Sequence, residues 1–526
     1  MDAILDKPPR PAPTGRGERT SWRERLVEEM PTDRVAGLLA PLGLTVIAGI
    51  MRFWGLTSRK GIYFDEVYYT HDAYTLFHHG YEQDTTCTGP GFVVHPPLGK
   101  WLMGLSEWLF GSTDCANIRH GNPELGWRFA SAVAGTIAVF VVARTARRMF
   151  RSTVLGCFAG LLMAFDGLEF VQSRIGILDI FLMLGLVLAL ACLVADRDDG
   201  RRRLAARLDA AVADGTGSGV ATAGYGPRLG LRPWRILCGI CLGASLGVKW
   251  SALYTVVAFA ALAIAWDVGA RRRAGVQRPV RAALRKDVLG WFTCFIPLPF
   301  AVFMSTWTGW FASSGGYDRH TPTRPGKGVF GALSNWWNYQ DQIWTFHDHL
   351  STPHKYESKP FSWLVLGRPV DYDFTALKYG QHGCRIRGGC YKEILALGNP
   401  AVWWIGTLAL VGVIALWVVR RDWRAAMVVV GFTISFAPWL AFPERTMFFF
   451  YALPLLPFLV LAITAMAGLA LGGRGISEVR ALAGALTVGI YAIVVVLFFV
   501  YFYPILANQM ISIPGWRARM WFPGWI

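Results

Sequence analysis

Two adjacent carboxylates are the residues of this chain whose types and position best suit chemistry. Asp65 and Glu66 lie shortly after the first apolar run, within the aromatic stretch 64–69. An apolar surface raises the pKa of a neighbouring carboxyl, and such a group can accept a proton from a hydroxyl nucleophile. An acidic pair is also an ordinary way to cap a helix start. The pair alone therefore leaves both a catalytic base and a helix cap open.

A second set of polar groups lies near the ends of other apolar runs. His95 and Lys100 flank a Pro-Pro dipeptide at a predicted helix start, a geometry that suits an anionic head group. Any one cation could be an anchor whose side chain extends to the membrane surface. Several cations expected at one membrane face, together with the acidic pair, favour a site for a membrane-embedded phosphate. The other members of this set are Arg128, Arg174, Asp179, Lys249 and Arg445.

Histidines in the second half of the chain are further candidates. His347 and His349, followed by His354, have a spacing that could bind a metal ion, but we favour a substrate site without a metal. Tyr69 and Glu444, which adjoin the acidic pair and Arg445, are candidates for contact with an acceptor. The pattern requires neither a metal nor another cofactor.

The elements that must position these residues are membrane helices. Of 526 residues, 53% are hydrophobic and only 17% are charged, against about 25% in a typical soluble chain. Runs of about 20 apolar residues can cross a hydrocarbon layer of about 30 Å. Composition therefore excludes a soluble enzyme, a disordered chain and an extracellular disulfide scaffold. It predicts an all-α polytopic membrane protein with about 11 spans, at residues 35–51, 127–143, 153–166, 176–195, 235–248, 251–267, 287–306, 400–419, 425–441, 447–470 and 481–503.

The net charge of +17 follows from this topology. About 30 of the 52 basic residues fall in the six segments expected in the cytoplasm, as the positive-inside rule requires, so no nucleic-acid partner is needed. The stretch 235–267 is read as two short spans because one long span would place the basic loop after it outside. The plasma membrane is the expected location, with the N-terminus in the cytoplasm and the C-terminus and the site outside.

A single transmembrane domain, 35–526, is predicted to follow a disordered cytoplasmic N-terminus, 1–34. Two large segments, 52–126 and 307–400, are expected outside, and their aromatic content is typical of loops with short interfacial helices. The Ala/Arg/Gly-rich segment 196–234 is interpreted as a cytoplasmic linker.

Four of the nine cysteines lie in the two outer segments. An even number in an oxidising compartment favours disulfides over a metal site. The most local pair is Cys384 with Cys390, which leaves Cys87 with Cys115.

The motifs together resemble one known family, and they are collinear across nearly the whole chain. Asp65-Glu66 in the first outer loop, the sequence 95–100 (His-Pro-Pro-Leu-Gly-Lys), Arg128, and the segments 174–179, 245–250 and 443–457 are similar to the bacterial (actinobacterial) protein O-mannosyltransferases. That family has the C-type glycosyltransferase fold.

The resemblance implies an activity. Such enzymes transfer mannose from the lipid polyprenyl-phosphate-mannose to a Ser or Thr hydroxyl of an exported polypeptide, with inversion at the sugar. By motif, Asp65 would be the general base and Glu66 would position the acceptor, although the sequence does not separate these two roles. The basic residues would hold the lipid phosphate. Membrane lipids, and the secretion channel that delivers the acceptor, are the other expected partners.

Two alternatives have different signatures. A C-type transferase that moves another sugar to a lipid or cell-wall glycan would share the architecture. A transporter would show inverted repeats and charges near the membrane midplane, and neither is evident. Eukaryotic relatives carry a β-trefoil module in the late loop, for which 307–400 is too short, so acceptor selection must differ here.

Overall fold

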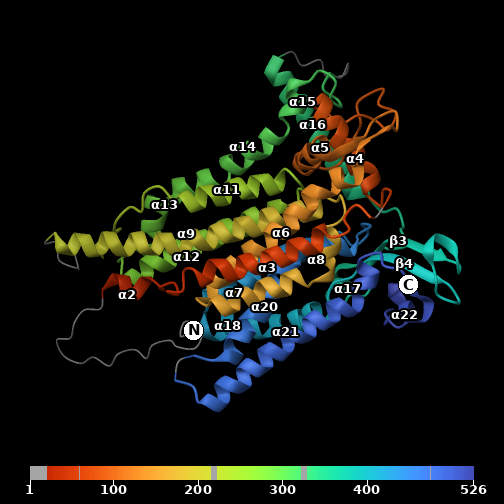
Figure 1. Cartoon of the computed structure of the whole chain (residues 1–526). Coiled ribbons are helices and arrows are strands. Elements are labelled where there is room, and N and C mark those ends of the chain that lie inside the picture. The colour runs from red at the N-terminus through yellow and green to blue at the C-terminus, as the bar shows by residue number, and fades with distance from the viewer. Residues whose placement is uncertain (1–20, 59, 215–221, 321–327, 474) are drawn as a thin grey trace.

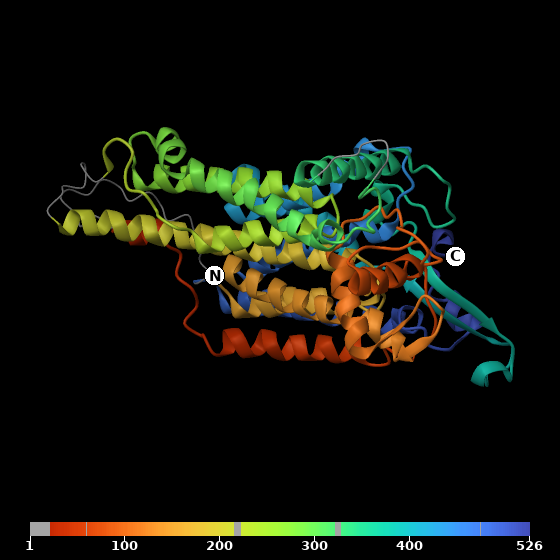
Figure 2. The same cartoon turned by 90° about the horizontal axis from the view of Figure 1, so that it is seen from above.

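The protein is a bundle of long helices with two loop regions at one end (Figures 1 and 2). The structure is a computed structural model that describes residues 21–58, 60–214, 222–320, 328–473 and 475–526. Among these residues, nine helices or paired helices are long and apolar enough to span a membrane. They are α3 (Ala36–Phe53), α6 (Pro123–Phe150), α9 (Asp179–Ala213), α12 (Ala252–Ala274), α13–α14 (Pro279–Phe295 and Pro297–Thr306), α18 (Pro400–Arg420), α19–η2 (Trp423–Phe436 and Ala437–Ala441), η3–α20 (Phe449–Leu455 and Leu456–Leu471) and α21 (Glu478–Leu506).

The remaining two predicted spans are shorter apolar helices. They are α7 (Thr153–Ala164) and α11 (Pro233–Leu246). All eleven apolar runs thus form helices, but two are too short to span alone. The stretch 235–267 does form two helices, because α11 ends at Leu246 and α12 begins at Ala252.

The helix boundaries follow local sequence signals. The side chain of Asn122 accepts a hydrogen bond from Leu125 N and Pro123 occupies the first turn, so α6 begins there. At the other end, Arg151 adopts a left-handed conformation and Ser152 caps α7. The helix α9 continues to Ala213, so the first part of the predicted linker is helical rather than irregular.

The first loop region contains two helices that face the bundle end. They are α4 (Glu66–His79) and α5 (Leu98–Phe110), followed by the hairpin β1–β2 (Gly111–Thr113 and Arg119–Gly121). Gly104 of α5 lies against the backbone of Ala73 in α4, an approach that leaves no room for a side chain. Cys87 and Cys115 form a disulfide, as paired from the sequence.

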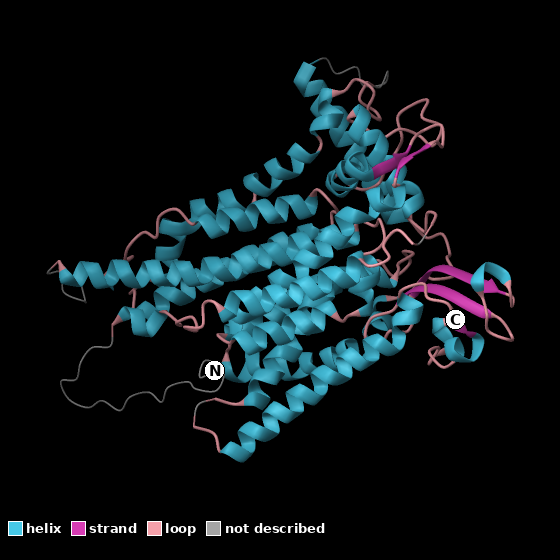
Figure 3. Cartoon of the chain, viewed as in Figure 1, coloured by secondary structure: helices cyan, strands magenta, loops and turns pink. Residues whose placement is uncertain are grey.

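The second loop region adds helices and a small sheet (Figure 3). An entirely α-helical fold is therefore not quite what the chain forms. The strands β3 (Val370–Leu377), β4 (Cys390–Ala396) and β5 (Ile511–Ser512) pair antiparallel in that order, and a Cys384–Cys390 disulfide closes the turn between the first two. The short β5 brings the C-terminal segment to the same end as both loops. The helices here are α15 (Thr308–Ala312), α16 (Gly328–His349), α17 (Pro360–Leu364) and α22 (Ile513–Arg517).

The N-terminal segment differs from its prediction as a disordered tail. Residues 1–20 lie outside the described residues, but 21–34 are ordered and include α2 (Trp22–Leu26). Leu26 is buried against Leu204 and Leu208 of α9. The apolar face of α2 removes these side chains from water, which gives the segment a reason to fold.

Candidate active site

The acidic pair opens α4, and its two carboxylates have different surroundings. Glu66 is fully buried, and its oxygens accept hydrogen bonds from Arg128 Nε and Nη2 at 2.8 and 2.9 Å. They also accept bonds from the backbone N–H groups of Tyr63 and Gly176, at 2.9 and 2.8 Å. The expectation that Glu66 positions an acceptor does not fit this arrangement, because the carboxylate cannot reach an acceptor without losing these bonds. Glu66 instead fixes the helix start that carries Asp65.

Asp65 is half-buried and is held at the helix start without a side-chain cap bond. Burial raises the pKa of Asp65 to about 6, partly opposed by the nearby Lys249 ammonium. A carboxylate with this pKa is ionised near neutral pH and is more basic than an exposed aspartate. Of the two open interpretations of the pair, the geometry therefore favours Asp65 as the base.

Opposite Asp65, an ion pair joins the start of α9 to the turn between α11 and α12. Lys249 Nζ donates to Asp179 Oδ2 at 2.7 Å, and both side chains are largely buried. Lys249 Nζ also lies 5.2 Å from the centre of the Tyr451 ring. The tight turn predicted at Lys249 thus places a cation beside the acidic pair.

Two histidines and an arginine complete the polar end of the site. His347 Nε2 donates to Val94 O at 2.8 Å, and Arg445 Nη2 donates to His347 Nδ1 at 3.2 Å. Burial and the Arg445 charge lower the pKa of His347 to about 4, so this imidazole is neutral. The His95 ring lies 5.1 Å from the His347 ring, and burial holds the pKa of His95 well below its usual value. Arg445 Nε is buried and has no hydrogen-bond partner within the part of the chain that the structure describes.

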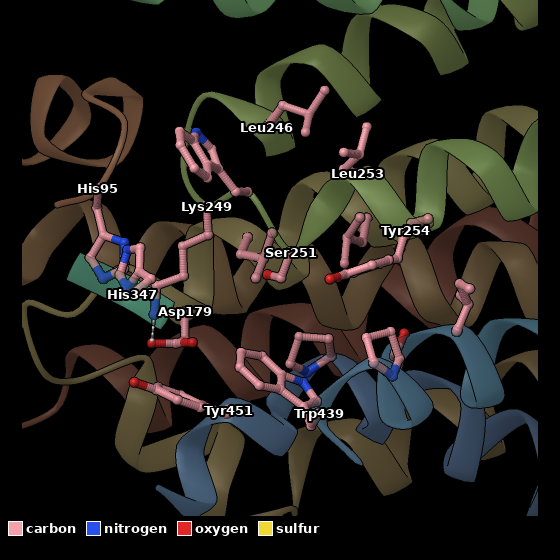
Figure 4. A pocket seen from close by; sticks show the side chains of 18 of the residues that line it. His95, Asp179, Leu246, Lys249, Ser251, Leu253, Tyr254, His347, Trp439 and Tyr451 are labelled. Carbon is pink, nitrogen blue, oxygen red and sulfur yellow. Dashed lines mark hydrogen bonds and ion pairs between the residues drawn. The ribbon is translucent and has the colours of Figure 1, made fainter. Parts of the chain in front are cut away.

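These groups line one end of a cavity of about 560 Å³ (Figure 4). Figure 4 shows His95, His347, Lys249 and Asp179 gathered at one side, with Leu253, Tyr254 and Trp439 farther along. Most of the rest of the lining is apolar, namely Leu182, Leu186, Leu246, Phe300, Phe303, Ile434, Pro438, Phe442 and Pro454, and it also includes Asp348 and the hydroxyl groups of Ser251, Thr255 and Ser435. A charged head followed by an apolar channel fits a lipid with an anionic head group.

Three of the expected phosphate ligands do not line this cavity. Arg128 is paired with Glu66, and Arg174 donates to the carbonyls of Met51, Arg52 and Trp54 at the end of α3. Lys100 pairs with Glu82 and lies 3.6 Å from Asp72. Arg128 and Lys100 neutralise buried carboxylates, and Arg174 caps the end of α3. These three cations therefore stabilise the structure around the site and do not line it. Lys249 and Arg445 are the expected cations that reach the cavity.

Two family models match the sequence. One, described as dolichyl-phosphate-mannose-protein mannosyltransferase, matches residues 43–209, and one described as the C-terminal four TMM region of protein-O-mannosyltransferase matches 332–525. A polyprenol-phosphate-mannose–protein mannosyltransferase of Mycolicibacterium smegmatis (strain MKD8) is 38% identical over 510 residues, 94% of each chain. The Corynebacterium glutamicum protein of that name is 33% identical over 504 residues, 92% of each chain. This chain belongs to the protein O-mannosyltransferase family.

A solved structure of this family has the same fold. The Saccharomyces cerevisiae protein O-mannosyltransferase Pmt1–Pmt2 complex bound to the sugar donor matches with a TM-score of 0.69 at 16% identity, over 94% of this chain and 95% of that chain. The C-type glycosyltransferase fold and the resemblance stated from the motifs are both confirmed.

The acceptor candidates fall in different places in this mannosyltransferase. Tyr69 is buried behind Asp65 with its ring 6.2 Å from His95, so it packs within the site. Glu444 is exposed, and His349 is exposed with Nδ1 bonded to Thr345 O of its own helix, so neither lines the cavity. Within the described part of the chain, no three His, Cys, Asp or Glu residues are grouped as a metal site would need.

Sequence reasoning missed several residues of the site. Just outside the cavity lining, Asp72 lies seven positions after Asp65 on the same face of α4, close to Lys100, and burial raises the pKa of Asp72 to about 6. Tyr451 lies within the motif segment 443–457 but was not singled out. No sequence pattern marks Trp439 or Ser251 as a site residue, because only the packing of α19–η2 against the start of α12 brings them to the cavity.

Proposed function

We propose that this protein transfers mannose from polyprenyl-phosphate-mannose to Ser or Thr hydroxyls of exported proteins, with inversion at the sugar. The observation that carries the proposal is the cavity, which has Lys249 and Arg445 at its polar end and an apolar channel behind them, with Asp65 close to Lys249. The channel suits a polyprenyl chain, and the two cations suit its phosphate. The names of the M. smegmatis and C. glutamicum relatives agree with this donor and acceptor.

In the proposed reaction, the phosphate lies against Arg445 Nε, which lacks a partner, and near Lys249 Nζ. The acceptor hydroxyl oxygen attacks the anomeric carbon while the bond from that carbon to the phosphate oxygen breaks. The hydroxyl proton passes to Asp65, and the bonding electrons leave with the phosphate as a polyprenyl-phosphate anion. The two cations stabilise this charge in the transition state, and one displacement with one base inverts the configuration.

The neutral state of the two histidines supports this assignment of roles. An imidazolium beside Arg445 would add a third positive charge to a buried cluster, at a high desolvation cost. A neutral His347 instead accepts from Arg445 and thereby orients the guanidinium toward the cavity. In the proposal, His95 therefore acts as a hydrogen-bonding wall of the sugar site, His347 holds Arg445, and Asp179 holds the Lys249 ammonium.

Sidedness and further partners belong to the same proposal. The loop regions, the site and the C-terminus lie at one end of the bundle, and the basic segments favour the other end as cytoplasmic (Figure 1). The site then faces the outside of the plasma membrane, where exported chains emerge. Association with the secretion channel would bring an acceptor to the site before it folds.

The experiment uses purified full-length protein with a Ser/Thr-rich peptide. We expect glycopeptide from polyprenyl-phosphate-mannose and none from the matched peptide with Ala at every Ser and Thr. Polyprenyl-phosphate-glucose serves as the donor control and should support little transfer. If the protein consumes the mannose donor but modifies only an added glycolipid or glycan, the alternative C-type transferase with a lipid or cell-wall acceptor replaces the proposal.

A further inference from the structure

A second cavity lies at the end of the bundle opposite the active site. It has a volume of about 700 Å³ and is enclosed by α2, the segment 27–34, the end of α6 and the far part of α9. Along α9, Arg201 lies 22 residues beyond Asp179, which at 1.5 Å per residue is roughly 33 Å from the active site. That length matches the hydrocarbon thickness of a membrane, so this cavity opens at the other membrane surface. Figure 1 shows α2 at this end of the bundle, away from β3 and β4.

The lining of this cavity carries a large excess of positive charge. Eight arginines face three carboxylates, which are Glu28, Glu29 and Asp198. Glu28 is already engaged by Arg424 at 2.6 Å, and Asp198 by Arg151 at 2.9 Å. The arginines in the lining are Arg23, Arg34, Arg144, Arg147, Arg148, Arg151, Arg201 and Arg202.

One of these arginines is buried and, among the described residues, has no hydrogen-bond or ion-pair partner. The side chain of Arg201 lines the cavity, the residue is only 6% exposed, and its Nε has no hydrogen-bond partner. Among the described residues, no ion pair joins its guanidinium to a carboxylate. A buried charge that lacks a partner is costly, whereas a phosphate oxygen bound to it would supply charge-assisted hydrogen bonds.

Ion pairs hold the segment 27–34 across the cavity. Arg147 binds Asp33 at 2.7 Å, and Glu28 lies within 3.7 Å of both Arg151 and Arg197. Glu29 pairs with Arg23 at 3.3 Å, so each carboxylate of the segment is engaged, and the lining that includes Arg201 keeps an excess of positive charge. The cavity is thus a built pocket rather than an open patch of surface arginines.

The surface next to the cavity is suited to lipid chains. Directly after Arg34, the helix α3 presents Val35, Leu38 and Leu39, which are 71%, 47% and 57% exposed. These side chains belong to a membrane-spanning helix and would face acyl chains. Basic pockets between membrane helices bind anionic lipid head groups, and this arrangement has both the basic pocket and the adjoining apolar face.

We propose that this cavity binds the phosphate of an anionic phospholipid, with Arg201 as a principal ligand and the acyl chains along the start of α3. The site is separate from the donor cavity and plays no part in the transfer reaction. Inorganic phosphate has the same chemistry as the phosphate of a lipid head group, so the test distinguishes free phosphate from a lipid as the bound ligand. The lipid would also cover the ordered segment 27–34 and tie it to the membrane.

The test uses the delipidated full-length protein in a neutral detergent. Phosphatidylglycerol, phosphatidylcholine with the same chains, and inorganic phosphate are titrated separately, and bound lipid is measured by native mass spectrometry. We expect phosphatidylglycerol to bind at least about tenfold more tightly than phosphatidylcholine, and Arg201→Gln to weaken phosphatidylglycerol by about tenfold or more, as loss of a charged hydrogen bond predicts. Arg203→Gln is the matched control, because Arg203 lies on the same helix, pairs with Asp199 and does not line the cavity.

A second variant, near the mouth of the cavity, keeps the test informative if the Arg201→Gln protein does not fold. Arg202 also lines the cavity but its side chain is 56% exposed, so Arg202→Gln should fold normally and weaken phosphatidylglycerol to a smaller extent. Equal binding of the two lipids, or equal binding by the Arg201→Gln and Arg203→Gln proteins, overturns the proposal. Inorganic phosphate that binds as tightly as phosphatidylglycerol overturns the lipid as the source.

Discussion

At the scale of single residues, neighbours in sequence have unlike tasks. Asp65 has no cap bond and lies near Lys249 and Asp179, which line the cavity. Glu66 is fully buried and bound by Arg128 and two backbone N–H groups. The difference comes from the first turn of α4, which points successive side chains about 100° apart. One carboxylate therefore lies beside the polar end of the cavity and the other in the protein interior.

Replacing each carboxylate by its amide separates these roles. Asp65→Asn should lower kcat by about 10²–10⁴-fold, the usual contribution of a general base, and should leave donor binding and the melting temperature unchanged. Glu66→Gln should lower the melting temperature, because Arg128 loses its charged partner in a buried position, at a cost of about 3–5 kcal/mol. Mannosyl transfer and thermal unfolding are measured on both variants. Full activity in the Asp65→Asn protein would exclude Asp65 as the base.

The pKa of Asp65 should set the pH dependence of mannosyl transfer. Since burial raises this pKa to about 6, the base is protonated and inactive below that pH. The value of kcat/KM, which reports the free enzyme, should fall about tenfold per pH unit below 6 and level off above it. Asp72 has a similar raised pKa, so an Asp72→Asn protein should keep the same acid limb if Asp65 is responsible. Loss of that limb in the Asp72 variant would reassign the titrating group.

Arg445 is expected to act on the donor. Because Arg445 lines the cavity and its buried Nε has no hydrogen-bond partner among the described residues, Arg445→Gln should raise the KM for polyprenyl-phosphate-mannose by about 10-fold or more, from a lost charged hydrogen bond of about 1.5–3 kcal/mol. The KM for the peptide should change little. Arg385→Gln is the control, since Arg385 is exposed on the β3–β4 turn. An unchanged donor KM in the Arg445 variant would remove this residue from the phosphate site.

At the scale of elements, close packing of α4 on α5 sets the position of the base. A Cβ on Gly104 would lie 2.6 Å from Ala73 O and 2.8 Å from Phe77 Cβ. The site also depends on two short turns, one before α4 and one between α11 and α12, that bring Asp65 and Lys249 together. The helices α4 and α5 and these two turns lie outside the membrane spans, and few residues hold each of them in place.

Gly104→Ala tests whether that packing matters for catalysis. The added methyl group forces α5 away from α4, which should cost about 1–3 kcal/mol and lower kcat, because Asp65 moves with its helix. Gly43→Ala is the control, since Gly43 lies in α3 with open space around it and alanine favours helix there. Melting temperature and transfer rate are measured for both. If the Gly104 variant matches Gly43→Ala in both, the helix contact does not set the site.

At the scale of the whole molecule, both loop regions, the C-terminal strand and the active site lie at one end (Figures 1 and 2). The opposite end contains the ends of α6, α9 and α12 with their arginines. In the proposed topology, the basic residues place this opposite end in the cytoplasm. The proposed lipid cavity and the active-site cavity then lie near opposite membrane surfaces.

Cysteine labelling in intact cells checks this orientation. A cysteine at Tyr379, exposed at the β3–β4 turn, should react with a membrane-impermeant maleimide in intact cells. A cysteine at Arg272, at the end of α12, should react only after the cells are permeabilised. Both variants should be expressed and active, because neither position touches the site. The reverse labelling pattern would invert the proposed topology.

The spans, the family and most of the chemistry-bearing residues can be predicted from the amino-acid sequence. Apolar runs of about 20 residues must become helices in lipid, since backbone N–H and C=O groups have no water to bond, and the motifs from Asp65 to Arg445 carried the resemblance. The disulfide pairs also followed from local spacing.

Which of the charged side chains line the cavity depends on how the helices and loops pack together. Arg128, Arg174 and Lys100 have the same residue types and predicted membrane face as Lys249 and Arg445, yet they bind carboxylates or carbonyls inside the protein. Whether a cation meets an internal acceptor depends on segments far apart in the chain, such as α3 and the turn before α9. The pairing of β4 with β5, and the unpartnered Arg201, likewise arise from long-range packing. Residue type and spacing along one segment do not contain that information.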